Sequence, residues 1–148
     1  MLPVRKSLPH TAPAWVRADE AIFFLTICGQ RRGANQFCSP STAAGLLDSI
    51  AFRHQRGDWW VHLWLLMPDH VHALVSTPSD RPLSKVVAQW KEFTTKTLAV
   101  QWQRSFFEHR LRHDESFDAK ADYILQNPVR KGLIARAEDW PYRWMPQK

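Results

Sequence analysis

The stretch "LLMPDHVHALVS", residues 65–76, places two histidines inside an otherwise apolar segment. Residues 58–67 predict a strand, "MPDH" predicts a turn, and residues 70–77 predict a second strand, so that the two strands form a hairpin. His70 and His72 are two residues apart on the second strand and therefore point to the same side of the sheet. They are either buried histidines with ordinary hydrogen-bond partners or a pair that holds an ion between them.

Further elements surround this hairpin in the sequence. Apolar periodicity predicts a strand over 21–30, helices over 41–57 and 79–102, and another strand over 105–113. A last helix over 114–127 has acidic residues in its first turn and ends at Pro128. The tail over 129–148, which is basic and aromatic, is expected to be irregular.

The order β-α-β-β-α-β, followed by one more helix, predicts an α+β fold of the ferredoxin-like split βαβ type. In this topology the first and third strands are the inner pair of an antiparallel sheet, and the first two helices cover one of its faces. The strand with the two histidines is therefore expected to be central. We expect a single domain over 1–148, with its core over about 20–128.

The composition is typical of a globular chain with a polyanionic partner. Of 148 residues, 45% are hydrophobic, and 20 Lys and Arg against 14 Asp and Glu give a formal charge of +6 and a pI near 9.7, which favours nucleic acid. No apolar run approaches the roughly 20 residues that cross a bilayer, and the N-terminus lacks the apolar stretch of a signal peptide. Cys28 and Cys38 match no metal or redox spacing, so we expect free thiols in a cytoplasmic protein.

The predicted helix before Pro128 offers a third metal ligand and a nucleophile. Tyr123 and Asn127 lie four residues apart, so they are neighbours on one helical face. The Asn127 carbonyl oxygen can join the two histidines around a divalent ion, with the Tyr123 hydroxyl nearby. The alternative is a half-buried tyrosine and an asparagine that ends a helix.

These groups together suit chemistry on a phosphodiester. A tyrosine phenol, with an ordinary pKa of about 10, becomes a useful nucleophile where a metal ion polarises the phosphate and neutralises its developing charge. The phenol would displace a 3′-oxygen and leave a 5′-phosphotyrosine, which conserves the bond energy for rejoining.

Three motifs together resemble a known family. The segments "MPDHVHALV", "YILQNPVRKGL" and "EDWPYRW" are similar to those of the single-tyrosine HUH transposases, which include the insertion-sequence-200-like proteins, and the best match is the branch called REP-associated tyrosine transposases. The likeness extends over nearly the whole chain. One departure is that Arg143 and Trp144 follow Pro141-Tyr142 where the family often has two serines.

The resemblance implies a fold, a site and a substrate. The fold would be the HUH endonuclease version of the ferredoxin-like sheet, with His70-Val71-His72 on a central strand. Tyr123 would be the nucleophile, Asn127 the third ligand, and the cofactor Mg²⁺ or Mn²⁺. The substrate would be single-stranded DNA beside a palindromic hairpin in the bacterial cytoplasm, cut and rejoined during DNA transposition and recombination.

The residues expected to bind DNA follow from charge clustering alone. Basic residues gather between Lys85 and His113 and again after "YILQNP". We expect contacts to DNA phosphates from Lys91, Lys96, Arg104, Arg110, Arg112, Arg130 and Lys131. For any one of them the alternative is a solvated residue on a helix surface.

Other interpretations of the same residues stay open. A histidine-triad nucleotide hydrolase would need a third histidine where Leu74 stands. His109 and His113, with Glu108 nearby, form either a second metal set or a structural pair. The main alternative function is a non-catalytic protein that binds hairpin DNA. The chain acts as a monomer or a homodimer, and we favour the monomer.

Overall fold

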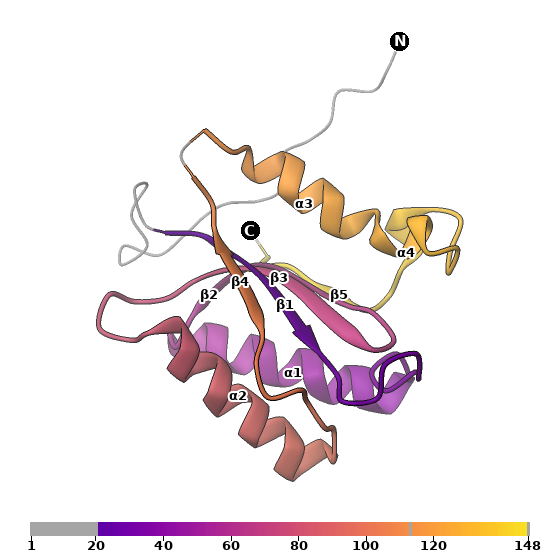
Figure 1. Cartoon of the computed structure of the whole chain (residues 1–148), viewed down its shortest axis with the longest axis horizontal. Coiled ribbons are helices and arrows are strands. Elements are labelled where there is room, and N and C mark those ends of the chain that lie inside the picture. Colours follow the sequence, from indigo (N-terminus) through magenta and orange to yellow (C-terminus); the bar gives the residue numbers. More distant parts are fainter. Residues whose placement is uncertain (1–20, 113, 148) are drawn as a thin grey trace.

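The computed structural model describes residues 21–112 and 114–147 (Figure 1). Residues 1–20, His113 and Lys148, which the predicted single domain over 1–148 includes, lie outside the described residues. The elements in chain order are β1 (Phe23–Cys28), α1 (Pro40–Arg56), β2 (Trp60–Leu66), β3 (His70–Ser76), α2 (Leu83–Leu98), β4 (Phe107–Arg110), α3 (Phe117–Leu125), α4 (Asn127–Arg130), the 3-10 helix η1 (Ala137–Asp139) and β5 (Arg143–Trp144). The predicted α+β class and its β-α-β-β-α-β series are confirmed.

The strands form one antiparallel sheet in the order β4-β1-β3-β2-β5. The first and third strands are therefore inner strands, as predicted. His72 on β3 lies opposite Thr26 on β1, and His70 lies opposite Cys28. Because β3 is paired on both sides, the direction of each of its side chains is fixed by two neighbouring strands.

The two faces of the sheet bury different cores. Figure 1 shows α1 and α2 on one face and α3 on the other. Alternation along β3 sends Val71 and Val75 into the core under α1 and α2, and Leu74 into a second cluster with α3. The first core also holds three fully buried indole rings, those of Trp59, Trp64 and Trp90.

Several predicted bounds change in the structure. α1 ends at Arg56 because Gly57 takes a φ of 88°, a left-handed conformation that glycine adopts without strain. α2 begins after Pro82 and ends at Leu98, well inside the predicted 79–102. β4 is likewise shorter than predicted. None of the helices in the described ranges has the length and apolar character that crossing a bilayer requires.

The structure corrects the bounds of the helix predicted over 114–127, which is observed as α3. It ends at Leu125, and Asn127 begins the separate helix α4. Pro128 has no backbone N–H and cannot continue the hydrogen-bond ladder of α3. Asn127 therefore does not share one unbroken helix with Tyr123.

The prediction of an irregular tail over 129–148 is wrong at three short stretches. Residues 129 and 130 end α4, and later residues form η1 and the edge strand β5, in which Trp144 pairs with Trp64 of β2. Trp140 is buried, and its Nε1–H donates to the carbonyl oxygen of Leu66 at 3.0 Å. The tail thus packs onto the sheet beside the histidine hairpin.

Candidate active site

His70 and His72 lie side by side at the start of β3. Their ring centroids are 4.7 Å apart, with ring planes at 79°. They alternate with Val71, which belongs to the core under α1 and α2, so both rings project from the opposite face, on which α3 lies. The prediction that the two side chains share one face of the sheet is confirmed.

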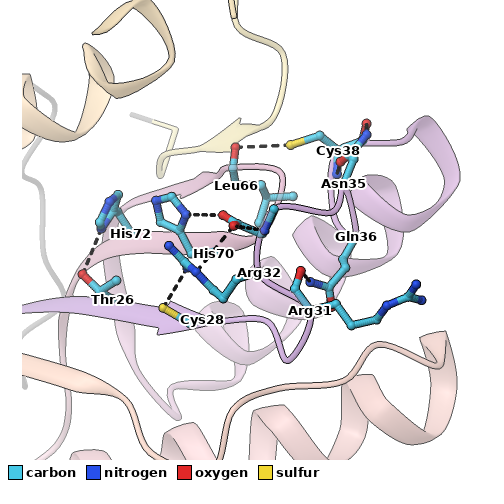
Figure 2. Close-up of polar contacts among 12 residues, drawn as sticks. Thr26, Cys28, Arg31, Arg32, Asn35, Gln36, Cys38, Leu66, His70 and His72 are labelled. Carbon is cyan, nitrogen blue, oxygen red and sulfur yellow. Dashed lines mark hydrogen bonds and ion pairs between the residues drawn. The ribbon is translucent and has the colours of Figure 1, made fainter. Parts of the chain in front are cut away.

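Each imidazole is anchored through its Nδ1 atom. The Nδ1 atom of His70 lies 2.8 Å from Oδ1 of Asp69, and that of His72 lies 3.0 Å from the Thr26 hydroxyl oxygen (Figure 2). A ring that donates its Nδ1–H keeps Nε2 as the unprotonated nitrogen, which is the usual arrangement of a metal-binding histidine. Each ring can therefore offer Nε2 to an ion.

Burial lowers the pKa of both imidazoles. The pKa of His72 falls to about 3, mainly through desolvation and further through the neighbouring His70. Desolvation also lowers the pKa of His70, although the Asp69 carboxylate acts in the opposite direction. Both rings are therefore neutral at physiological pH, and neutral imidazole is the form that binds metal ions.

Asp69 ties the histidine pair to the loop after β1. Its Oδ2 atom accepts a hydrogen bond from the Gly33 N–H at 2.8 Å and lies 3.5 Å from Nε of Arg32. Burial raises the pKa of Asp69, but the Gly33 N–H, His70 and Arg32 outweigh it, so the pKa is lowered overall. Sequence analysis missed Asp69, Arg32 and Thr26. The only local signal was an acidic residue directly before the first histidine.

Tyr123 lies on α3 with 53% of its surface exposed. Its ring centroid is 6.2 Å from that of Phe24, which in turn is 5.6 Å from that of His72. The Arg130 guanidinium lies 4.2 Å from the centre of the Tyr123 ring and donates a hydrogen bond to the Tyr123 carbonyl oxygen. The Tyr123 ring is thus held between Phe24 of β1 and Arg130 of α4, and the Phe24 ring lies between it and His72.

Asn127, the predicted third ligand, begins α4 and is almost completely buried. Its side chain is only 5% exposed, and we find no hydrogen bond to its amide within residues 21–112 and 114–147. However, its amide atoms are not among the buried polar atoms that lack a partner in this part of the chain. Among the described residues no three His, Cys, Asp or Glu side chains gather to hold a metal ion. The set of His70, His72 and the Asn127 amide oxygen therefore stays a prediction.

Two of the predicted DNA-binding residues lie near the candidate site. The charge of Lys131 acts on His70, and that of Arg130 acts on His72. Lys131 also lines a pocket with His70 and Asp69. Lys131 thus lies beside His70, whereas the contacts of Arg130 are with Tyr123.

The other five predicted DNA-binding residues lie away from the histidine pair. One groove beside α2 is lined by Lys91, Lys96 and Arg104. There the Lys91 ammonium donates hydrogen bonds to two backbone carbonyl oxygens, and Lys96 pairs with Glu92 at 2.9 Å. Arg110 ends the strand β4, and Arg112 follows it. Their contact with DNA remains a prediction.

His109 has an acidic partner. Its Nε2 atom lies 2.9 Å from Oε1 of Glu115, which also accepts the Arg112 N–H. These two contacts, the Arg112 N–H foremost, lower the pKa of Glu115 to about 2. This contact fits a structural histidine, and His113, its partner in the alternative metal set, lies outside the described residues.

Comparison with known proteins supports the family resemblance that these motifs indicate. A sequence model of a family described as "Transposase IS200 like" matches residues 35–127, the range that contains His70, His72, Tyr123 and Asn127. The REP-associated tyrosine transposase of Escherichia coli (strain K12) is 29% identical over 85 residues, which cover 55% of this chain and 52% of that protein. A relative from Haemophilus influenzae is 32% identical over 94 residues, which cover 52% of this chain and 53% of the relative.

The chain spans about half the length of these two relatives. A solved structure, described as a REP-associated tyrosine transposase bound to a REP hairpin, matches with a TM-score of 0.73 at 22% identity, covering 97% of this chain and 82% of the other. That likeness shows a shared fold. The family match extends over more than half of the chain, and the resemblance inferred from the motifs is confirmed. The chain belongs to the IS200-like transposase family.

Proposed function

We propose that the protein is a metal-dependent endonuclease and strand transferase that cuts and rejoins single-stranded DNA beside palindromic hairpin repeats. The observation that carries the proposal is a pair of neutral histidines, both anchored through Nδ1, on the face that Tyr123 overlies. Relatives named REP-associated tyrosine transposases, one of them described as bound to a REP hairpin, support the substrate.

Tyr123 is the nucleophile in this proposal. Its phenol oxygen bonds to the phosphorus of the scissile phosphodiester while its proton passes to solvent. The bond from phosphorus to the 3′-oxygen breaks, and that oxygen takes up a proton to become a 3′-hydroxyl. The 5′ end stays on Tyr123 as a phosphotyrosine. Attack by a 3′-hydroxyl on this phosphotyrosine rejoins the strand and releases the phenol.

His70, His72 and Asn127 would hold the cofactor, Mg²⁺ or Mn²⁺. When bound, the ion polarises the scissile phosphate and offsets the charge that develops on it. The Asp69 carboxylate holds the His70 ring in the direction and tautomer that this task requires, and Thr26 holds the direction of the His72 ring.

Positive charge next to the reacting phosphate comes from Arg130 and Lys131. Their contacts to phosphate oxygens would hold the strand in position without reading its sequence. The five more distant basic residues would contact the DNA farther from the site of cleavage, and one copy of the chain supplies the whole catalytic set.

A cleavage assay tests the proposal directly. End-labelled single-stranded hairpins from palindromic repeats flanking the gene are incubated with the protein and Mn²⁺ or Mg²⁺, then separated on a denaturing gel. We expect a denaturant-resistant protein–DNA adduct that is lost with EDTA and in Tyr123→Phe. The phenylalanine keeps the ring between Phe24 and Arg130, so the variant removes the hydroxyl alone.

The chain offers a matched control, because it contains only two tyrosines. Tyr142 packs its ring against Trp140, with centroids 5.3 Å apart, and Tyr142→Phe should form the adduct at the normal rate. An adduct that persists in Tyr123→Phe would contradict the proposed nucleophile. Hairpins that bind tightly yet give no adduct with either metal would favour the alternative function, a non-catalytic hairpin-DNA-binding protein.

A further inference from the structure

A small pocket opens directly beside His70. Its volume is about 250 Å³, below the roughly 300–1,000 Å³ of typical small-molecule sites, so it has room for one planar ring. Three segments that are distant in sequence form its walls: the loop after β1, the β2–β3 turn and the residues after α4. The side chains on which the argument depends are those of Arg32, Asp69, His70, Lys131 and Leu133.

The walls on the sheet side are fixed by backbone hydrogen bonds. The Pro68 carbonyl oxygen accepts the N–H groups of Gln36 and Phe37 at 2.7 and 3.2 Å, and the Asp69 carbonyl oxygen accepts that of Gly29 at 2.8 Å. The Asp69 carboxylate holds Gly33 in the same way. A ligand would therefore meet a pocket that is already formed, which lowers the entropy lost on binding.

The lining combines apolar surface with positive charge. Leu133 is 45% exposed and offers an apolar side chain to a ligand, whereas Met67, which is only 1% exposed, packs in the core cluster behind the pocket. Arg32 and Lys131 supply the cations, although the Arg32 Nε atom also lies 3.5 Å from the Asp69 carboxylate, which lines the same pocket. Lys131 forms no ion pair or hydrogen bond through its side chain with any described residue, whereas Lys91, Lys96 and Lys120 are all engaged.

We propose that this pocket binds one unpaired DNA base next to the scissile phosphate, with Lys131 and Arg32 holding the phosphate attached to that base. The inference rests on the proposed function, because it places the reacting phosphate at His70. Apolar side chains are suited to the faces of an unstacked base, and the two cations to its phosphate. A phosphate alone would leave the apolar lining unused. The pocket would thus make the protein itself read one nucleotide beside the cut.

Nuclear magnetic resonance on the full chain in EDTA tests the pocket without any chemistry. The probes are the four deoxynucleoside 5′-monophosphates, deoxycytidine and inorganic phosphate. We expect the nucleotides to shift the Met67 methyl and the Gly33 amide signals, with affinities that differ among the four bases. Inorganic phosphate should leave the Met67 methyl signal in place, and the nucleoside should bind more weakly than its monophosphate.

Variants separate the two halves of the pocket. Lys131→Gln should weaken nucleotide binding about fivefold, the effect of one lost contact to a phosphate. Leu133→Ala should weaken binding of nucleotides but not of inorganic phosphate. The control is Lys85→Gln, a like charge change in a different pocket, with Arg56 and Asp58, at the opposite end of β3. It should not alter nucleotide binding.

Each outcome is decisive. The proposed base-binding role of the pocket is wrong if nucleotides leave the Met67 and Gly33 signals unshifted, or if they bind Lys131→Gln as tightly as the natural chain. It is also wrong if inorganic phosphate reproduces every shift. The cleavage assay is read separately. Adduct formation without a nucleotide response contradicts base binding in the pocket and supports the proposed function. A nucleotide response without adduct keeps the pocket and counts against cleavage.

Discussion

The two faces of the sheet come from the same strands but differ in what their side chains do. On the face under α1 and α2, β3 contributes aliphatic side chains such as Val71, which pack with indole rings; those of Trp64 and Trp90 are 4.9 Å apart. On the face under α3, the same strand contributes His70 and His72, whose rings bond to polar partners.

This difference shows how a strand can be part of a rigid core and of a reactive surface at once. Packing on the first face fixes the strand, and strict alternation then fixes where the two imidazoles point on the second. We therefore expect changes under α1 and α2 to affect stability, and changes on the histidine face to affect metal and DNA binding while the fold persists.

The largest expected effect is on the stability face. Trp90 is fully buried, and its Nε1–H donates to Oγ of Ser49 at 3.0 Å. Trp90→Ala should lower the free energy of unfolding by about 3–5 kcal/mol, measured by urea denaturation, because it leaves a large cavity. The fraction that stays folded should bind Mn²⁺ normally. A folded variant that has lost Mn²⁺ would show that the two faces are not separable.

Removal of a proposed metal ligand should give the next largest effect. His72→Ala should weaken Mn²⁺ binding by at least about 100-fold, more than the loss of an outer hydrogen-bond partner, while unfolding changes by less than about 1 kcal/mol. Titration calorimetry and urea denaturation measure the two quantities. The control His109→Ala removes a histidine that pairs with Glu115 instead. Equal Mn²⁺ affinity in both variants would refute the proposed site.

Asp69→Asn should act on the metal through His70. An asparagine amide can donate to Nδ1 and so favour the tautomer with the proton on Nε2, the atom needed for the ion. Mn²⁺ affinity should fall about 10–100-fold. Asp58→Asn is the matched control, because Asp58 is also a carboxylate that pairs with basic side chains, here those of Arg56 and Arg81. A loss of Mn²⁺ affinity in the control as large as that in Asp69→Asn would argue against this role.

The smallest effect concerns the ring of Tyr123. Arg130→Gln removes the cation over the ring and should slow adduct formation about fivefold, the equivalent of about 1 kcal/mol. Single-turnover rates at saturating hairpin separate this effect from weaker DNA binding. Arg136→Gln, which breaks only an exposed pair with Glu138, should leave the rate unchanged. A change in affinity alone would make Arg130 a DNA contact and not a residue that positions Tyr123.

Much of the fold was predictable because local sequence patterns determine its elements. The hairpin around Asp69, the central position of β3 and the two long helices follow from periodicity, turn residues and topology. β5 could not be found in this way. Its two residues are a strand only because Arg143 and Trp144 meet the edge of β2, a contact between segments almost 80 residues apart.

The candidate site was predictable only in part, for a similar reason. The histidine pair and Tyr123 stand out in the sequence, but Thr26 reaches His72 through the register of β1 against β3. Charge clustering also could not tell a free cation from an engaged one. Lys91 lies in the richest basic segment, yet its ammonium is bonded to backbone carbonyl oxygens.

The edges of the sheet carry a consequence for solubility. β5 spans only two residues, and β4 spans four, among them the exposed, charged Glu108 and Arg110. Short outer strands offer few free N–H and C=O groups, and charges on them oppose pairing with another copy. Concentrated solutions of this protein should therefore resist fibrillar aggregation along the sheet, and any association of two copies must use another surface.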